Sequence, residues 1–472
     1  MTEKEFAGRT VAVIGMARTG MAAAEVLTDL GARVILFDQQ PANKLESAIN
    51  EAKKLGVEVK VEHPGVDFDG VDLLIPSPGV RATSPIFTEA KARGVEIMSE
   101  IELAYRISKA PMIAITGTNG KTTTTVLTGK IMEADGRETY IGGNVAAGGL
   151  KLPLVKAAHQ ASPDAVIVAE ISTFQLEWIS SFKPKVAMLL NITVDHPDRH
   201  TPEEYAFLKE SIYRYQDSND YSVSNLDNSP SAAAGSRAHG QKLIFSRLQP
   251  VEQGAFVEDR LIKVRIGGRE TVACSIEDIE SSGSLPGTHN IENVLAASCA
   301  AIAMGAKPES IVTAVRNFAG VEHRMEKVLT AGGVEYINNS MCTNAEAFAR
   351  SVESVGRPAV VIAGGKHKGG SLEQVAQAVK KYAKHLVLIG ASADEIEEAV
   401  RETGYTNITR AASMDDAVAK AAALAAPGDT VILAPGCASF DMFISFEERG
   451  DVFKSAVKQQ VSLRWEKDEK GC

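Results

Sequence analysis

Residues 113–125, "IAITGTNGKTTTT", combine a strand pattern, a glycine-containing loop and the start of a helix. In such a unit the backbone N–H groups of the loop and the positive helix end face phosphate oxygens. Lys121 would reach the β and γ phosphates of a nucleotide, and the Thr122 hydroxyl could hold a magnesium ion. Because Ile115 replaces the first glycine of the full GxxxxGK pattern, a threonine-rich helix cap is the alternative. The expected phosphate contacts are Gly117, Thr118, Asn119, Gly120, Lys121, Thr122 and Thr123.

Two residues that could bind a metal ion follow strand patterns. Glu170 comes toward the end of one in "VAEISTFQLEW", and His196 follows another in "LLNITVDHPDRH". Because ligands collect at the carboxyl ends of parallel strands, we expect both side chains near the phosphate loop. A strand-edge cap and a turn histidine are the alternatives. Taken with the loop, the two residues favour a magnesium-nucleotide site.

A second nucleotide-like turn lies near the N-terminus. Gly15, Ala17 and Gly20 in "GMARTG" imitate a dinucleotide fingerprint, with alanine at the glycine that lets a pyrophosphate approach the backbone. Asp38 ends the next strand pattern, where a ribose contact is common. A bound nucleotide moiety and a purely structural helix–strand turn both fit this pattern. Two phosphate sites would mean that two phosphorylated molecules are brought together.

The elements that must position these residues form an α/β protein. A chain of 472 residues exceeds what one hydrophobic core usually supports. Apolar strand patterns alternate with helical stretches and restart twice, which predicts three domains with largely parallel sheets and flanking helices. The predicted domains are a Rossmann-like N-terminal domain (1–99), a P-loop central domain (100–320) and a Rossmann-like C-terminal domain (321–472). The polar stretch 229–285 could hold a β-rich insertion.

Composition narrows the class of partners. The net charge of -10 argues against a broad electrostatic grip on nucleic acid or an anionic membrane. The five cysteines lack metal spacing, so we expect free thiols and a reduced compartment. We find neither a signal-peptide core nor an apolar run of spanning length, which predicts a cytoplasmic protein.

An ordered set of motifs resembles one enzyme family. The motifs are "TGTNGKTT", "AEISTFQLE", "NITVDHPDRH", "LPGTHNIENVLAA", "VEHRME" and "CASFDMFISFEERG". They resemble the Mur ligases along nearly the whole chain. The "STFQLE" stretch, the short first domain and the "CASFDMF" ending look most like the branch that adds D-glutamate in peptidoglycan precursor synthesis.

The resemblance implies an ATP-dependent amide ligase that acts as a monomer on small-molecule substrates. The first domain would hold the uridine diphosphate of a UDP-N-acetylmuramoyl-L-alanine substrate, the central domain ATP and Mg²⁺, and the third domain the amino acid. ATP would phosphorylate the terminal carboxylate, and the amine of D-glutamate would attack the acyl phosphate. A carboxylate is a poor electrophile, and the phosphoryl group supplies a better leaving group.

The resemblance also assigns roles residue by residue. Lys121 and Thr122 match contacts to the ATP phosphates and the first magnesium, and Glu170 and His196 match metal and acyl-phosphate ligands. Lys209 matches a lysine that takes up carbon dioxide and becomes a carbamate for a second magnesium, with an exposed helix lysine as the alternative. Asn290 matches the adenine contact, and Arg324 matches a residue that reaches the γ-phosphate, with a surface helix charge as the alternative.

The substrate contacts implied by the resemblance lie in the outer domains. Ordinary turns and solvated loop residues are the alternatives, and Lys366 could add a charge beside Lys368. The UDP-sugar contacts would be Arg18, Thr19, Asp38, Ser77, Pro78, Gly79 and Asn144. The amino-acid contacts would be Thr343, Lys368, Ser439 and Phe446.

One stretch departs from the family pattern. The third domain carries "YINNSMCTN", where the family usually has "NDSKATN", so Asn339 and Met341 replace an aspartate and a lysine. Because one negative and one positive charge are lost together, the local net charge stays near neutral. This favours a paired exchange of the two residues. It leaves open a related ligase with a different acceptor or UDP-linked precursor. A nucleotide-binding regulatory module and a dehydrogenase are further alternatives, which the intact set of candidate catalytic residues and Ala17 disfavour.

Overall fold

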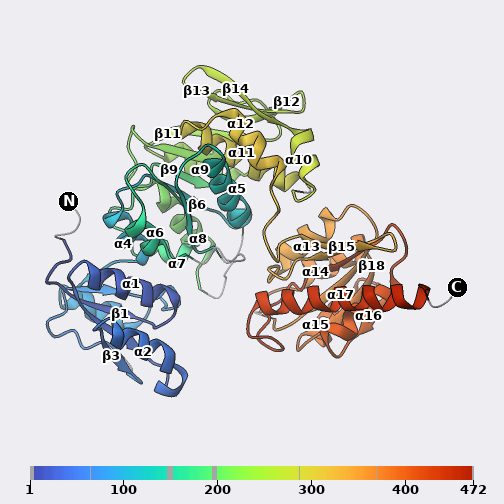
Figure 1. The fold of residues 1–472 in the computed structure, drawn as a ribbon, viewed down its shortest axis with the longest axis horizontal. Coiled ribbons are helices and arrows are strands. Elements are labelled where there is room, and N and C mark those ends of the chain that lie inside the picture. Colours follow the sequence, from blue (N-terminus) through green and yellow to red (C-terminus); the bar gives the residue numbers. More distant parts are fainter. Residues whose placement is uncertain are drawn as a thin grey trace. The chain divides into compact units, whose positions relative to one another are not determined.

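The computed structural model describes residues 5–63, 65–145, 152–193, 199–285, 287–367 and 369–469, with side chains as far as Gln460. The chain divides into two compact units, one of Met1–Ser281 with His289–Phe318 and one of Ser282–Thr288 with Ala319–Cys472. The first unit contains two sheets and the second contains one, each with flanking helices (Figure 1). The predicted α/β class with largely parallel sheets is confirmed. The domain boundaries near residues 99 and 320 stay predictions.

The first sheet has five parallel strands in the order β3-β2-β1-β4-β5. Its central strands are continuous apolar runs because helices cover both faces of a parallel sheet. The strands are β1 (Thr10–Ile14), β2 (Arg33–Asp38), β3 (Glu58–Val61), β4 (Leu73–Ile75) and β5 (Glu96–Ile97). The helices are α1 (Arg18–Asp29), η1 (Ala42–Lys44), α2 (Glu46–Lys54), α3 (Pro85–Ala92) and α4 (Glu100–Ile107).

The second sheet carries the phosphate loop. Its nine strands have the order β14-β13-β12-β11-β10-β9-β6-β8-β7, and only the pairs of β13 are antiparallel. This antiparallel extension explains the polar stretch at 229–285. The strands are β6 (Met112–Thr116), β7 (Thr139–Gly143), β8 (Val166–Glu170), β9 (Val186–Leu189), β10 (Tyr221–Asn225), β11 (Gln241–Ser246), β12 (Gly254–Glu258), β13 (Leu261–Ile266) and β14 (Arg269–Ser275). The helices are α5 (Lys121–Ala134), α6 (Leu154–Gln160), α7 (Thr173–Leu176), α8 (Pro202–Glu210), η2 (Ser211–Tyr213), α9 (Ser229–Arg237), α10 (Ile276–Ser282), α11 (Thr288–Ala303) and α12 (Pro308–Arg316).

The sheet of the second unit has the order β15-β16-β20-β17-β18-β19, and only β15 is antiparallel to its neighbour. Two apolar clusters cover its two faces. The strands are β15 (Glu326–Ala331), β16 (Val334–Asn338), β17 (Ala359–Gly364), β18 (Ala383–Ile389), β19 (Ile408–Arg410) and β20 (Thr430–Leu433). The helices are α13 (Ala345–Ser354), α14 (Glu373–Tyr382), α15 (Ala393–Glu402), α16 (Met414–Leu424) and α17 (Phe446–Glu469).

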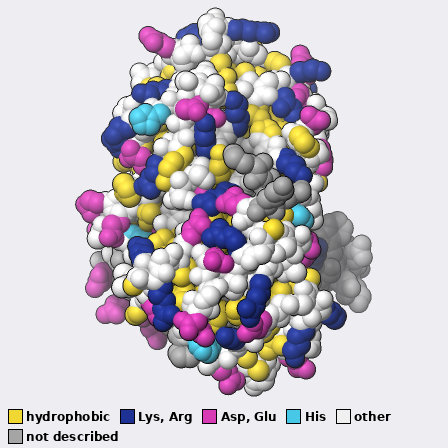
Figure 2. Space-filling model, turned by 90° about the vertical axis from the view of Figure 1, so that its left-hand side faces the viewer, with side chains coloured by type: hydrophobic (Ala, Val, Ile, Leu, Met, Phe, Trp, Pro, Cys, Tyr) yellow, Lys and Arg dark blue, Asp and Glu magenta, His cyan; other side chains and the backbone are white. Residues whose placement is uncertain are grey.

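Among the described helices, none combines the length and the apolarity needed to cross a lipid bilayer. On the face in Figure 2, basic and acidic side chains are interspersed with apolar ones.

A buried carboxylate joins helices α4 and α6. Glu100 is 2% exposed and accepts a hydrogen bond of 2.7 Å from the Val155 N–H. Burial raises the pKa of Glu100 to about 7, and the N–H groups of Val155 and Leu154 and the charge of Arg18 only partly offset this effect. A raised carboxyl pKa favours the folded state below the ordinary value of 4.5, and this contribution is lost as the pH rises to about 7.

Glu100→Gln should therefore stabilise the protein more at pH 8 than at pH 5, by up to about 3 kcal/mol in the free energy of unfolding. Chemical denaturation of the variant and the wild type at both pH values measures the difference. Glu51→Gln, on the exposed face of α2, is the matched control and should show no such difference. An equal effect of Glu100→Gln at both pH values would contradict the assignment.

Candidate active site

The phosphate loop joins the buried strand β6 to helix α5, as the sequence predicts. Gly117 and Gly120 have φ angles of +156° and +84°. A Cβ atom on Gly120 would lie 2.4 Å from the Oδ1 of Asn293, and one on Gly117 would lie 3.0 Å from the Cβ of Leu190. Glycine is therefore required at Gly120 both by its left-handed conformation and by the close approach of α11.

Asn191, two residues after the end of β9, holds the loop from the neighbouring strand. Its Oδ1 accepts from the Asn119 N–H at 2.8 Å, and its Nδ2 donates to the Asn119 carbonyl at 3.1 Å. Its own carbonyl accepts from the Thr118 N–H at 3.0 Å. Asn191 is not among the residues predicted from the sequence. A polar residue ending the apolar run "VAMLLN" is the signal that could have found it.

Lys121 begins α5 and bends back over the loop. Its Nζ donates to the carbonyls of Gly117 at 2.9 Å and Thr118 at 2.8 Å. The ammonium group is thus held beside the loop whose backbone would cradle the phosphates. Because the lysine side chain is flexible, its ammonium group can exchange these carbonyl acceptors for a phosphate oxygen.

Thr122, Glu170 and Asn144 meet at the carboxyl ends of β6, β8 and β7. The Thr122 hydroxyl donates to Glu170 Oε2 at 2.7 Å, and Asn144 Nδ2 donates to Glu170 Oε1 at 3.0 Å. The Asn144 N–H also donates to the Glu170 carbonyl at 2.9 Å. The carboxylate is 2% exposed and both side-chain donors are neutral. A hydroxyl and a carboxylate at this spacing fit a magnesium ion, which prefers oxygen ligands. His196 lies outside the described residues.

Lys209 on α8 is buried against the loop. Its side chain is 2% exposed, and Nζ donates to the Gly117 carbonyl at 2.7 Å. Nζ also lies 4.6 Å from the centre of the Tyr205 ring. The Tyr205 hydroxyl hydrogen-bonds the Thr118 hydroxyl at 3.2 Å. The alternative of an exposed helix lysine is therefore wrong, and Lys209 reaches the loop that carries Lys121.

Asn290 belongs to a chain of hydrogen bonds that runs from α11 to α5. Its Oδ1 accepts from Asn293 Nδ2 at 3.0 Å, and Asn293 Oδ1 accepts from the Thr124 hydroxyl at 3.1 Å. Both asparagines are buried. Asn290 is among the residues predicted from the sequence and Asn293 is not, although the spacing of three residues places both on one helix face.

The loops at the carboxyl edge of the first sheet also converge. Asp38 accepts from the N–H groups of Met16 and Gln40, both at 2.9 Å, so its carboxylate braces the turn before α1. A Cβ atom on Gly15 would lie 3.0 Å from Ser77 Cβ. Ser77 Oγ accepts from the Gly79 N–H at 3.4 Å. The predicted UDP-sugar contacts in these loops therefore share one edge.

Arg18 starts α1 and lines a groove of about 480 Å³. Charged side chains of both signs line it, including Glu25, Lys44 and Lys156. Thr19 follows Arg18 in the first turn of α1.

Arg199 links the two sheets of the first unit. Its Nη2 donates to the Val80 carbonyl at 2.9 Å, directly after the predicted UDP-sugar loop. The same nitrogen lies 3.3 Å from Glu177, and the guanidinium lies 4.0 Å from the centre of the Phe174 ring. Burial raises the pKa of Glu177, and Arg199 partly offsets this. Arg199 could not be predicted from the sequence because its partners are distant in the chain.

Arg324 lies in a tight turn of the second unit and not on a helix, so the alternative of a surface helix charge is wrong. The residues on either side, His323 and Met325, have φ angles of +62° and +46°. The His323 carbonyl accepts from the Met341 N–H at 3.0 Å, and the Met325 N–H donates to Asn339 Oδ1 at 3.1 Å. The two positions that depart from the family pattern therefore both hold this turn.

Arg449 joins the loops where the amino-acid contacts are predicted. The side chain is 1% exposed and donates to Ser340 Oγ at 3.0 Å, the Ser340 carbonyl at 2.8 Å and the Cys437 carbonyl at 3.0 Å. Burial lowers the pKa of Arg449 to about 10. Lys366 and Ala438 exchange backbone hydrogen bonds of 2.8 and 3.0 Å. The glycine-rich loop and the "CASFDMF" loop are thereby paired.

The predicted amino-acid contacts lie on these loops. Ser439 is buried, and its carbonyl accepts from the Phe443 N–H. Phe446 begins α17, and its carbonyl accepts from the Ser340 hydroxyl at 2.7 Å. Thr343 directly precedes Asn344, which caps α13. Lys368 lies outside the described residues.

Three family models match the chain in order. The MurD-like N-terminal domain of the Mur ligases matches residues 9–99, the Mur ligase middle domain matches 115–301, and the glutamate ligase domain of the Mur ligases matches 323–437. Together they cover most of its length.

Relatives and solved structures agree with these matches. A UDP-N-acetylmuramoylalanine–D-glutamate ligase of Pelotomaculum thermopropionicum is 42% identical over 96% of this chain and 98% of its own. The enzyme of that name from Geobacter metallireducens is 40% identical over 96% and 98%.

Among structures, the UDP-N-acetylmuramate-alanine ligase MurC of Thermotoga maritima is similar in fold, with a TM-score of 0.60 and 17% identity over 95% of this chain and 99% of its own. A pseudomurein peptide ligase type C of Methanothermus fervidus has a TM-score of 0.56 and 18% identity over 91% and 97%. Because relatives at 40–42% identity span 96% of its residues, the chain belongs to the Mur ligase family, in its UDP-N-acetylmuramoylalanine–D-glutamate ligase branch.

Proposed function

We propose that the protein is an ATP-dependent ligase that adds D-glutamate to UDP-N-acetylmuramoyl-L-alanine. The observation that carries the proposal is the meeting of Thr122, Glu170 and Asn144 beside the loop of Lys121. This arrangement provides a phosphate cradle, a cation and a hard-oxygen metal site within one sheet edge. The names of the relatives supply the substrates.

In the proposed reaction, an oxygen of the substrate carboxylate attacks the γ-phosphorus of ATP, and ADP leaves. The amine of D-glutamate then attacks the acyl carbon, phosphate leaves, and the amine loses a proton. Lys121 and the loop N–H groups would hold the phosphates in line and stabilise the charge of the transferring group. Thr122 and Glu170, with His196, would hold Mg²⁺, which when bound neutralises charge on the phosphate oxygens.

The other predicted residues would bind the substrates. Asn290 would contact the adenine, and Arg324 would approach the γ-phosphate. The 1–99 domain would hold the uridine diphosphate through Arg18, Thr19, Asp38, the loop of Ser77, Pro78 and Gly79, and Asn144 of the central domain. The 321–472 domain would hold the two carboxylates of D-glutamate through Thr343, Lys368, Ser439 and Phe446. We propose that the enzyme works as a monomer in the cytoplasm.

We also propose that Lys209 is carbamylated. Its amine would attack carbon dioxide and release a proton, which replaces a cation with a two-oxygen anion suited to a second magnesium. The burial of Lys209 and its contact with the Gly117 carbonyl support this proposal, because they place the nitrogen at the phosphate loop.

The acceptor is tested by phosphate release with UDP-N-acetylmuramoyl-L-alanine and ATP. D-Glutamate, L-glutamate, D-aspartate, glycine and L-lysine are offered in turn. We expect D-glutamate to give the highest kcat/KM, because the two loops proposed to bind its carboxylates are paired by backbone hydrogen bonds in the second unit. A better rate with another acceptor would favour the alternative of a related ligase, to which Met341 could point.

A further inference from the structure

The turn that carries Arg324 is held in a conformation that its residues disfavour. The non-glycine residues on either side of Arg324 have positive φ angles. Non-glycine residues keep such angles only where surrounding contacts hold them. If these two residues relaxed to negative φ angles, the Arg324 side chain would turn to a new direction. The contacts around the turn therefore decide where Arg324 points.

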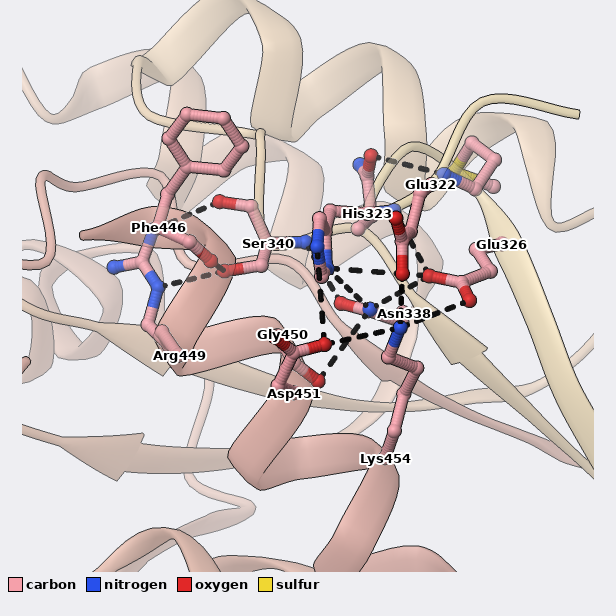
Figure 3. A network of polar contacts seen from close by, with 12 residues as sticks. Glu322, His323, Glu326, Asn338, Ser340, Phe446, Arg449, Gly450, Asp451 and Lys454 are labelled. Carbon is pink, nitrogen blue, oxygen red and sulfur yellow. Dashed lines mark hydrogen bonds and ion pairs between the residues drawn. The ribbon is translucent and has the colours of Figure 1, made fainter. Parts of the chain in front are cut away.

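One set of contacts comes from β15, β16 and helix α17, shown in Figure 3. Glu326 Oε2 accepts from the His323 N–H at 2.8 Å and from Asn338 Nδ2 at 2.9 Å. Asn338 Nδ2 also lies 3.1 Å from His323 Nδ1. Since Asn338 Oδ1 accepts from the Ser340 N–H, its amide nitrogen must face the imidazole, and Nδ1 accepts.

Lys454 of α17 closes this set. Its Nζ lies 2.7 Å from Glu322, 3.1 Å from Asp451 and 3.4 Å from Glu326. Burial disfavours the ammonium, but hydrogen bonds to Glu322 and Asp451 and the charge of Glu326 outweigh it and raise the pKa of Lys454. An ammonium group that neutralises three carboxylates explains this acidic cluster without a metal ion.

Helix α17 approaches the turn unusually closely. A Cβ atom on Gly450 would lie 2.2 Å from His323 Nδ1 and 3.0 Å from Asn338 Nδ2. A glycine inside a long helix lowers its intrinsic stability. Its presence here fits the need to bring the helix backbone against the imidazole.

The second set of contacts comes from Asn339. Its Oδ1 accepts from the Met325 N–H, so its Nδ2 faces Ser351 Oγ at 2.6 Å. In this arrangement the Ser351 hydroxyl donates to the Ala347 carbonyl at 2.5 Å, and its oxygen accepts from the Asn339 amide. An amide supplies that donor, whereas an aspartate would be accommodated only if the Ser351 hydroxyl turned away from the Ala347 carbonyl to donate to the carboxylate.

We propose that Asn338, Asn339 and Lys454 are positioning residues that orient Arg324. This inference rests on the proposed function, because Arg324 is the group expected to reach the γ-phosphate. The inference also explains why asparagine stands at position 339, where the family usually has aspartate. The side chain fixes the turn and is not available to contact a nucleotide.

The test uses the full chain with Lys454→Met and Asn339→Ala, which removes the acceptor of the Met325 N–H, each alone and combined with Arg324→Ala. Each single variant should lower kcat for phosphate release about tenfold or more, since misplacing a reacting group by about 1 Å can cost a hundredfold. The reaction of Arg324→Ala is followed over hours so that its residual rate can be measured. In this background, neither change should lower kcat further. Lys458→Met, one turn along on the exposed side of α17, is the matched control and should leave kcat unchanged.

Hydrogen–deuterium exchange of the segment 321–326 provides a readout that needs no reaction. Exchange should be faster in both variants and unchanged in Lys458→Met. Wild-type kcat in either variant, an equal loss in the Arg324→Ala background, or unchanged exchange would overturn the inference. If Lys454→Met does not fold, Asn339→Ala is judged by the same outcomes. If the wild type is inactive but the variants show the expected exchange pattern, the proposed function is wrong and the positioning of the Arg324 turn is still supported.

Discussion

Lys121→Ala is expected to lower kcat by about a hundredfold or more while UDP-sugar binding stays nearly unchanged. The Lys121 ammonium is held over the carbonyls of Gly117 and Thr118, where it can stabilise the charge of a transferring phosphoryl group. Removing such a group costs about 3 kcal/mol or more in the barrier. Coupled phosphate release gives kcat, and isothermal titration with UDP gives the binding.

Lys130→Ala is the matched control for this variant. Lys130 lies on the same helix, 47% of its side chain is exposed, and it pairs with Glu133. An exposed pair of this kind contributes little, so the control should keep wild-type turnover. Near-normal phosphate release by Lys121→Ala would refute the role of the loop.

Lys209→Ala is expected to lose most of its activity, by about a hundredfold or more, and to recover part of it with added short-chain carboxylic acids. A small carboxylate can occupy the space of the missing side chain and supply the two oxygens of the proposed carbamate. The space exists because Lys209 is buried and ends at the Gly117 carbonyl. Phosphate release with and without formate or acetate measures the recovery.

The same acids added to Lys121→Ala serve as the control, because that variant lacks a cation and should show no recovery. Full activity of Lys209→Ala would contradict the proposal. So would an unmodified Lys209 in a structure of the liganded enzyme.

The central part of the site could be predicted because local pattern and sheet geometry determine it. Thr122 follows β6 and Glu170 ends β8, and these two strands are neighbours in a parallel sheet. Their side chains therefore had to meet at one edge, and they do so at 2.7 Å. The glycine-containing loop between β6 and α5 was likewise expected from the strand–loop–helix pattern.

Other features depend on contacts between distant segments and leave only weak local signals. Asn191 and Asn293 support the loop from β9 and α11, and neither stands in a spacing that specifies a partner. The burial of Lys209 could not be predicted because a lysine on a helix with mixed faces is most often exposed. The positive φ angles of His323 and Met325 had no signal either, since glycine or asparagine usually marks such positions.

The central claim is that this chain joins D-glutamate to UDP-N-acetylmuramoyl-L-alanine at the expense of ATP. Mass spectrometry of a reaction containing both substrates, ATP and Mg²⁺ tests it most directly, with nucleotides and phosphate measured in the same sample. We predict a product heavier by one glutamyl residue, with one ADP and one phosphate for each product formed. ATP consumption without that product, or no product with any of the five acceptors, would contradict the claim.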